Sequence, residues 1–150
     1  MASWSEFQDS APEFAGRVLS RFQGHPHHVL GTLDSRGAPR LSGINVMCDE
    51  GTLWFGSMPG ALKARDIARD PRVSVHSAPL DEHLTGGDAR IDGTAVPLGA
   101  ALARRWRPES PDGEFFRVDV ARVHLVEVRE EKLVVTMWNP RDGLRIVERS

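Results

Sequence analysis

The chain has 150 residues, of which 40% are hydrophobic and 27% charged, the balance expected of one folded soluble domain. Its formal net charge of -2 gives no overall attraction to nucleic acid or to an anionic membrane, so an anion site must be a local patch. A single cysteine, Cys48, excludes an internal disulfide and a cysteine-cluster metal site, and no apolar run is long enough to span a membrane. The N-terminal stretch MASWSEFQDSAPEF lacks a signal-peptide pattern, which favours a cytoplasmic protein.

The first 26 residues are expected to form an N-terminal helix that packs on the rest of a single domain covering residues 1–150. Ser10–Gln23 is predicted to be helical, with Ser10 as the cap and Pro12 in the first turn. Its apolar side chains recur at a helical spacing and fall on one face, namely Phe14, Val18, Leu19 and Phe22.

Extended segments dominate the rest of the chain. The first three are separated by turns of a few residues and are expected to form an antiparallel meander. Short helices are predicted at residues 61–69, before Pro71, and at residues 99–107, and Gly93 is a possible β-bulge. Six or more strands with few helical residues favour a mainly β fold, a closed or split barrel. The expected strands are residues 27–34, 39–48, 52–57, 72–78, 89–98, 115–128 and 131–140.

A glycine-containing turn before the helix at residues 61–69 is the strongest chemical signal. The segment GSMPGALK, Gly56–Lys63, lacks the glycine–lysine spacing of a P-loop, and no GxGxxG fingerprint is present. A turn that opens a helix nevertheless exposes free N–H groups, which favour an anion. Ser57 can donate a hydroxyl, and Lys63 is within reach of the same place, so a phosphate-type anion site is predicted. Arg40, at the start of the second strand, can approach the same end of the sheet, and its guanidinium suits phosphate oxygens.

Competing kinds of site have weaker support. His27 and His28 are adjacent, so on a strand they point to opposite faces, and no metal site is predicted. His76 or His83 as an axial haem ligand remains an alternative. Among the tryptophans, Trp138 is the best candidate for a wall of a substrate pocket.

An ordered set of motifs resembles the pyridoxamine 5'-phosphate oxidase-like, FMN-binding split-barrel proteins. It runs through VLGTLDSRGAPRLSGINVMCDEGTLWFGSMPGALKARDIARDPRVSV, residues 29–75, and GDARIDGTA extends the likeness to about Ala95. The resemblance implies a six-stranded antiparallel split β-barrel that forms a homodimer, with a cofactor at each of two interface clefts.

The resemblance also implies site residues. Arg40, Ser57 and Lys63 match positions that hold the cofactor phosphate, and Leu62 lies next to the matched lysine. The strand that runs beside the flavin ring is matched by Ser42, Gly43, Ile44 and Asn45.

The implied function is an FMN-dependent oxidoreductase that acts on a small organic substrate. Two departures from the family pattern stand out: Gly56 replaces an aromatic residue, and the C-terminal arginine–proline motif of the vitamin-processing enzymes has no good match. The alternatives are a coenzyme F420-dependent reductase, and a flavin- or haem-binding protein without turnover. Neither nucleic acid nor a membrane is expected as a partner.

Overall fold

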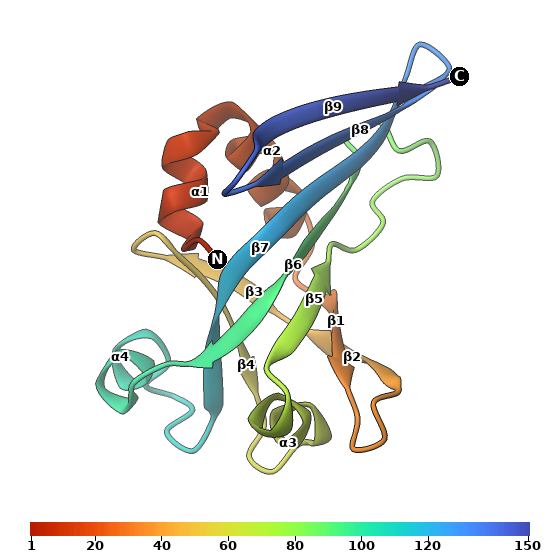
Figure 1. Cartoon of the computed structure of the whole chain (residues 1–150). Coiled ribbons are helices and arrows are strands. Elements are labelled where there is room, and N and C mark those ends of the chain that lie inside the picture. The colour runs from red at the N-terminus through yellow and green to blue at the C-terminus, as the bar shows by residue number, and fades with distance from the viewer.

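The computed structural model describes all 150 residues and is built mainly of antiparallel β-strands, with four short helices (Figure 1). This confirms the predicted mainly β class. The helices are α1 (Trp4–Ser10), α2 (Pro12–Gln23), α3 (Leu62–Arg69) and α4 (Ala100–Trp106). The strands are β1 (His28–Leu33), β2 (Pro39–Ile44), β3 (Val46–Asp49), β4 (Thr52–Ser57), β5 (Arg72–His76), β6 (Asp88–Pro97), β7 (Glu114–Arg129), β8 (Lys132–Asn139) and β9 (Gly143–Arg149).

One curved sheet runs in the order β2-β1-β5-β6-β7-β4-β3, and β8 and β9 extend it from β7. The two ends of this path, β2 and β3, follow one another in the chain with only Asn45 between them. The sheet therefore curls until its edges meet at Asn45, but no ladder joins β2 to β3, so it is split rather than closed. The two hairpins expected in this region are present, β1 with β2 and β3 with β4, but the single strand predicted over residues 39–48 is divided at Asn45.

Strand β7, 16 residues long, is the centre of the sheet because it pairs with β6, β4 and β8. The β6–β7 register shifts between Asp92 and Gly93, which confirms the expected bulge. A side chain at Gly93 would collide with the carbonyl oxygen of Asp119, so the close approach of the two strands requires glycine there.

The N-terminal residues form two helices, not one. Ser3 caps α1 in a capping box with Glu6, and α2 begins at Pro12, directly after Ala11. The prediction that Ser10 caps the long helix was wrong, because Ser10 is the last residue of α1. The capping box at Ser3 is a local signal that the single-helix prediction left out.

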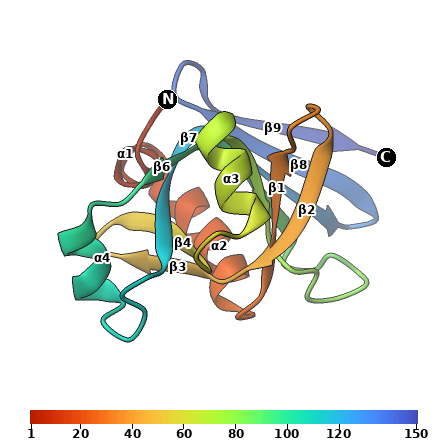
Figure 2. The same ribbon diagram turned by 90° about the horizontal axis from the view of Figure 1, so that it is seen from below.

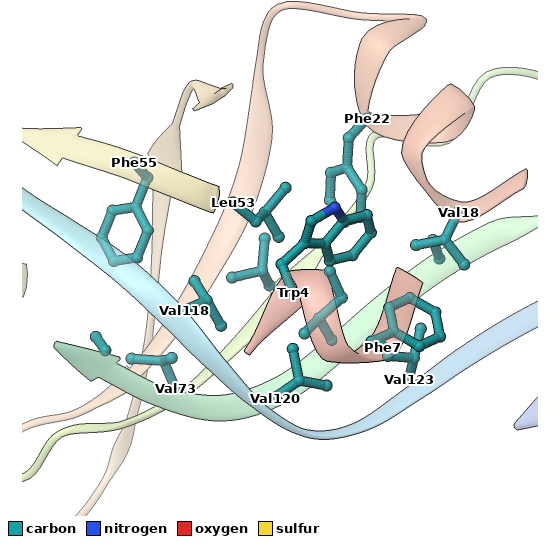
Figure 3. Packing of buried hydrophobic residues seen from close by; sticks show 14 of the residues in the cluster. Trp4, Phe7, Val18, Phe22, Leu53, Phe55, Val73, Val118, Val120 and Val123 are labelled. Carbon is teal, nitrogen blue, oxygen red and sulfur yellow. The ribbon is translucent and has the colours of Figure 1, made fainter. Parts of the chain in front are cut away.

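Both N-terminal helices pack their apolar side chains onto the sheet. Figure 3 shows Trp4 and Phe7 of α1 lying against Val120 and Val123 of β7. The same cluster contains Phe22 of α2, so the core lies between the helix pair and the sheet. The buried residues in the cluster that Figure 3 labels also include Val18, Leu53, Phe55, Val73 and Val118.

Helices α3 and α4 lie at the opposite end of the molecule from the β8–β9 hairpin (Figure 1). Seen from below, α3 lies across the end of the barrel near β1, and α4 lies beside β3 and β4 (Figure 2). Helix α3 buries Ala64, Asp66 and Ile67, whereas α4 buries no residue. None of the four helices has the length and apolar character needed to cross a membrane.

Candidate functional site

A cleft of about 870 Å³ opens where the barrel is split. It lies between the Asn45 junction, the end of β4, the start of α3 and the loop at residues 107–113. Edge strands leave backbone groups without partners, so a polar ligand meets free N–H and C=O groups at a split of this kind. The predicted site residues that line the cleft are Gly43, Ile44, Asn45, Ser57 and Lys63.

Lys63 is the only lysine that lines the cleft, and no negatively charged group neutralises its ammonium. Its Nζ donates a hydrogen bond to the carbonyl oxygen of Gly43 at 2.9 Å, and no carboxylate lies within ion-pair distance. Burial lowers the pKa of Lys63, because removing water penalises the charged form. An anion in the cleft would supply the charge that the protein does not.

The start of α3 adds neutral donors to the same place. Ser57 is 7% exposed, and its Oγ donates only to the neighbouring carbonyl of Met58, at 3.1 Å. No side chain caps α3, and Gly60, with a φ of 72°, makes the turn that leads into it. The first-turn N–H groups of Leu62 and Lys63 are therefore open to a ligand, although the Leu62 side chain itself points into solvent and does not line the cleft.

Arg40 and Ser42 do not line the cleft. Arg40 Nε donates to Asp66 Oδ2 at 2.7 Å, and Thr32 Oγ1 donates to the same oxygen at 2.7 Å. Burial by itself raises the pKa of the Asp66 carboxyl, but the bonds from Arg40 and Thr32 outweigh it and hold that pKa below its usual value. Part of the Arg40 charge is thus committed to Asp66, a partner that the sequence pattern did not reveal.

Three side chains stand out among the cleft residues that were not predicted from the sequence. His27 Nδ1 is 2.9 Å from Asn45 Oδ1, which ties the start of β1 to the junction between β2 and β3. Arg107 brings a guanidinium to the wall, with its Cζ 5.8 Å from the centre of the Trp54 ring and Nη1 donating to Glu109. Phe115, on β7, supplies an aromatic wall. All three come from segments distant from residues 40–63, and no local motif marks them.

Phe115 accounts for the glycine that departs from the family pattern at position 56. Gly56 and Phe115 are paired across β4 and β7, and a Cβ at Gly56 would lie 2.7 Å from Cε1 of the Phe115 ring. Gly113 also contacts this ring, because a Cβ at Gly113 would lie 2.6 Å from Cζ of Phe115. The ring thus lies against two positions without side chains, and the aromatic surface that β4 lacks comes from the neighbouring strand.

Trp138 lies in the core, so the structure corrects the expectation that it forms a pocket wall. Its side chain is 3% exposed, its ring lies 4.8 Å from that of Phe7, and its Nε1 donates to Ser10 Oγ. It belongs to the contact between β8 and the N-terminal helices, and it does not line the cleft. The reason is topological: β8 pairs with the far half of β7, beyond the bulge.

Comparison with known proteins gives one family. The sequence profile described as pyridoxamine 5'-phosphate oxidase matches residues 15–127, about three quarters of the chain. Among the curated proteins, none matches this chain.

Similar solved structures share the fold. A pyridoxamine 5'-phosphate oxidase-related, FMN-binding protein from Nostoc punctiforme has a TM-score of 0.65 and 14% identity, over 93% of this chain and 96% of that one. PhzG from Burkholderia lata, solved with tetrahydrophenazine-1-carboxylic acid, has a TM-score of 0.69 and 11% identity, over 91% and 88% of the two chains.

A third structure is nearer in sequence. It is a protein of unknown function from Agrobacterium tumefaciens with 27% identity and a TM-score of 0.58, matched over 76% of this chain and 57% of its own. With the split barrel, the open helix start at the split and the profile match over most of its length, the chain belongs to the pyridoxamine 5'-phosphate oxidase family.

Proposed function

We propose that this protein is a flavin-dependent oxidoreductase that binds FMN in the cleft at the split of the barrel and acts on a small organic substrate. The observation that carries the proposal is Lys63, a partly buried ammonium with only a carbonyl oxygen as its partner, at the uncapped start of α3. The family and the FMN-binding relative from Nostoc support a flavin in this position.

The residues present fit a flavin phosphate. Lys63 Nζ, Ser57 Oγ and the first N–H groups of α3 form one set of donors at one end of the cleft, and no carboxylate is close enough to Lys63 to compete with an anion. Arg40 does not line the cleft, but its Nε donates to Asp66 of α3, so its guanidinium adds positive charge beside this helix. Donors of this kind are those that bind phosphate at helix starts.

The ring end of the cleft has a different character. Ile44 and Asn45 bring backbone groups and one amide side chain to the split, next to Gly43, whose carbonyl oxygen already accepts from Lys63, and Phe115 lies in the same cleft. A bound flavin supplies hydride transfer to or from the substrate. Lys63 and Ser57 hold the phosphate, and Asn45 offers hydrogen bonds to the edge of the flavin ring. Phe115 excludes water from one face of that ring.

The proposal includes the assembly and the location of the protein, which is proposed to act as a homodimer in the cytoplasm. Exposed apolar side chains occur beside the cleft, with Met58 80% exposed and Leu62 54% exposed. A second copy of the chain that covers them would bury apolar surface and close the open side of the cleft.

Titration of the purified protein with FMN and with coenzyme F420, followed by fluorescence quenching, tests the proposal. FMN is expected to bind, and Lys63→Gln is expected to weaken it by about 10- to 100-fold, the loss expected for one charge-assisted hydrogen bond. Arg65→Gln is the matched control, because it removes the same charge from an exposed position on the same helix.

Two outcomes would contradict the proposal. Equal losses in the Lys63 and Arg65 variants would mean that only the general charge of α3 matters. Binding of F420 with no binding of FMN would mean that the cofactor of this site is the deazaflavin. Reduction of bound FMN followed by reoxidation with candidate acceptors then separates an enzyme from a carrier.

A further inference from the structure

A second cavity, of about 550 Å³, lies between α3 and α4, beside the proposed flavin site. Its walls come from the facing sides of the two helices, from the end of β6 and from the start of β7. Small-molecule sites in proteins have volumes of about 300–1,000 Å³ and mainly apolar walls, so this cavity has the size and the character of such a site.

Alanine side chains explain why the space between the helices is unfilled. Ala64 and Ala68 of α3 face the cavity from one side, and Ala100 and Ala103 of α4 face it from the other. Methyl groups are too short to meet across such a space, and protein interiors normally leave no void of this size. The cavity therefore offers apolar surface that gains free energy when a ligand covers it.

Helix α4 is fastened to the β3–β4 hairpin rather than to α3. The Trp106 ring stacks on Trp54 with centroids 5.2 Å apart, and Arg105 forms an ion pair with Glu50. No residue of α4 is buried, which agrees with the open space between α4 and α3. Figure 2 shows the two helices standing apart at this end of the barrel.

One cation of α4 lines the cavity without a partner. Arg105 and Arg107 are paired with Glu50 and Glu109, but Arg104 has no carboxylate within ion-pair distance. Glu114 also lines the cavity and is likewise unpaired, so a bound anion would gain from Arg104 and be opposed by Glu114. We propose that this cavity binds a small apolar carboxylic acid, with its ring or chain among the alanines and its carboxylate on the Arg104 guanidinium.

The cavity and the flavin cleft are neighbours. Phe115 and the loop residues Ser110, Pro111 and Gly113 line both. The acid would thus lie across the Phe115 ring from the cleft. This inference goes beyond the proposed function and does not depend on it, because none of the residues that hold the acid belongs to the flavin phosphate set.

Binding of 1-naphthoate to the full chain, measured by calorimetry beside the neutral isostere 1-naphthamide, tests the inference. The carboxylate is expected to bind about tenfold more tightly than the amide, and Arg104→Gln is expected to remove that preference. Arg105→Gln is the matched control and should retain it, because its charge is committed to Glu50. Glu114→Gln should tighten naphthoate binding, since it removes a repelling charge.

A cavity-filling variant keeps the inference falsifiable without risk to the fold. Ala103→Leu, on a helix with no buried residue, should abolish binding of both probes. No binding of either probe to the unaltered protein, or equal effects of Arg104→Gln and Arg105→Gln, would overturn the inference. So would a shift from dimer to monomer in Ala103→Leu, which would make the cavity an interface between copies. Lys63→Gln should leave naphthoate binding unchanged, which separates this result from failure of the flavin site.

Discussion

At the scale of single residues, Gly56 and Phe115 show how a position that departs from a family pattern is compensated by a neighbour in space. The Phe115 ring lies so close to Gly56 that no β-carbon fits without movement of the ring, which Gly113 restricts from its own side. Glycines in strands often mark places where an aromatic ring from the next strand covers the backbone. The aromatic wall of the cleft therefore depends on both residues, because the Phe115 ring fits only where residue 56 has no side chain.

Alanine at Gly56 is expected to destabilise the fold by about 1–3 kcal/mol, the usual cost of overpacking. In a Phe115→Ala background the same substitution should cost little, because the colliding ring is gone. Urea unfolding of the four proteins of this double-mutant cycle measures the coupling. If Gly56→Ala costs as much without the ring as with it, the clash with Phe115 is not the reason for glycine.

At the scale of elements, buried Asp66 fastens α3 to two strands. It accepts hydrogen bonds from Thr32 on β1 and Arg40 on β2, and Arg69 lies 3.5 Å away on its own helix. Lys63 is one turn earlier on α3, so these bonds also set the position of the open helix start. The carboxylate stabilises the cleft without lining it.

Asp66→Asn is expected to lower the free energy of unfolding by about 1–3 kcal/mol at neutral pH, since charged hydrogen bonds are lost at a buried position. The folded-state pKa of Asp66 lies below its ordinary value of 3.8, so its stabilising effect is present above that pH and is lost as the pH falls below it. The difference in melting temperature between wild type and variant should therefore shrink as the pH falls from 7 to 3. Asp70→Asn, at an exposed pair with Arg72, is the control and should cost much less. Parallel curves down to pH 3 would contradict the assignment.

At the scale of the whole molecule, His28 joins the N-terminal helices to the barrel. Its Nε2 lies 2.7 Å from the carbonyl oxygen of Phe22, and its Nδ1 accepts the N–H of Ala78 at 2.9 Å, an arrangement that suits the neutral ring. Burial lowers the pKa of His28, with backbone bonds opposing it in part. The charged form is thus disfavoured in the folded state.

The fold is expected to lose stability as the pH falls below 6.5, because the unfolded chain then takes up a proton that folded His28 resists. Unfolding midpoints at pH 7.5 and 5.5 measure this, and His28→Gln should reduce the difference. A residual slope is expected from His124, whose pKa is also lowered, by burial and by Arg90. The exposed His83→Gln should behave as wild type. An unchanged slope in the His28 variant would contradict the prediction.

Local signals made much of the fold predictable from the sequence. Alternating apolar residues and short turns located most of the strands, and Pro71 follows the end of α3 closely, because periodicity and turn chemistry depend only on near neighbours. The prediction of an anion site at Ser57 and Lys63 rests on signals of the same kind, since the turn, the hydroxyl and the lysine lie within seven residues. The division of the helices at Ala11 was missed because Ser10 resembles a cap when Ser3 is ignored.

Contacts between distant segments were decided only by the tertiary structure. The meeting of β2 and β3 at Asn45, the position of the Phe115 ring at Gly56 and the burial of Trp138 all follow from strand order and register. A strand pattern specifies which side chains alternate, but not which strand lies beside it or which end of it faces a cleft. By itself the sequence determined the family, the mainly β class and the grouping of Ser57 with Lys63 around one turn. The pairing of β7 with β4, β6 and β8 decided which distant residues surround that turn.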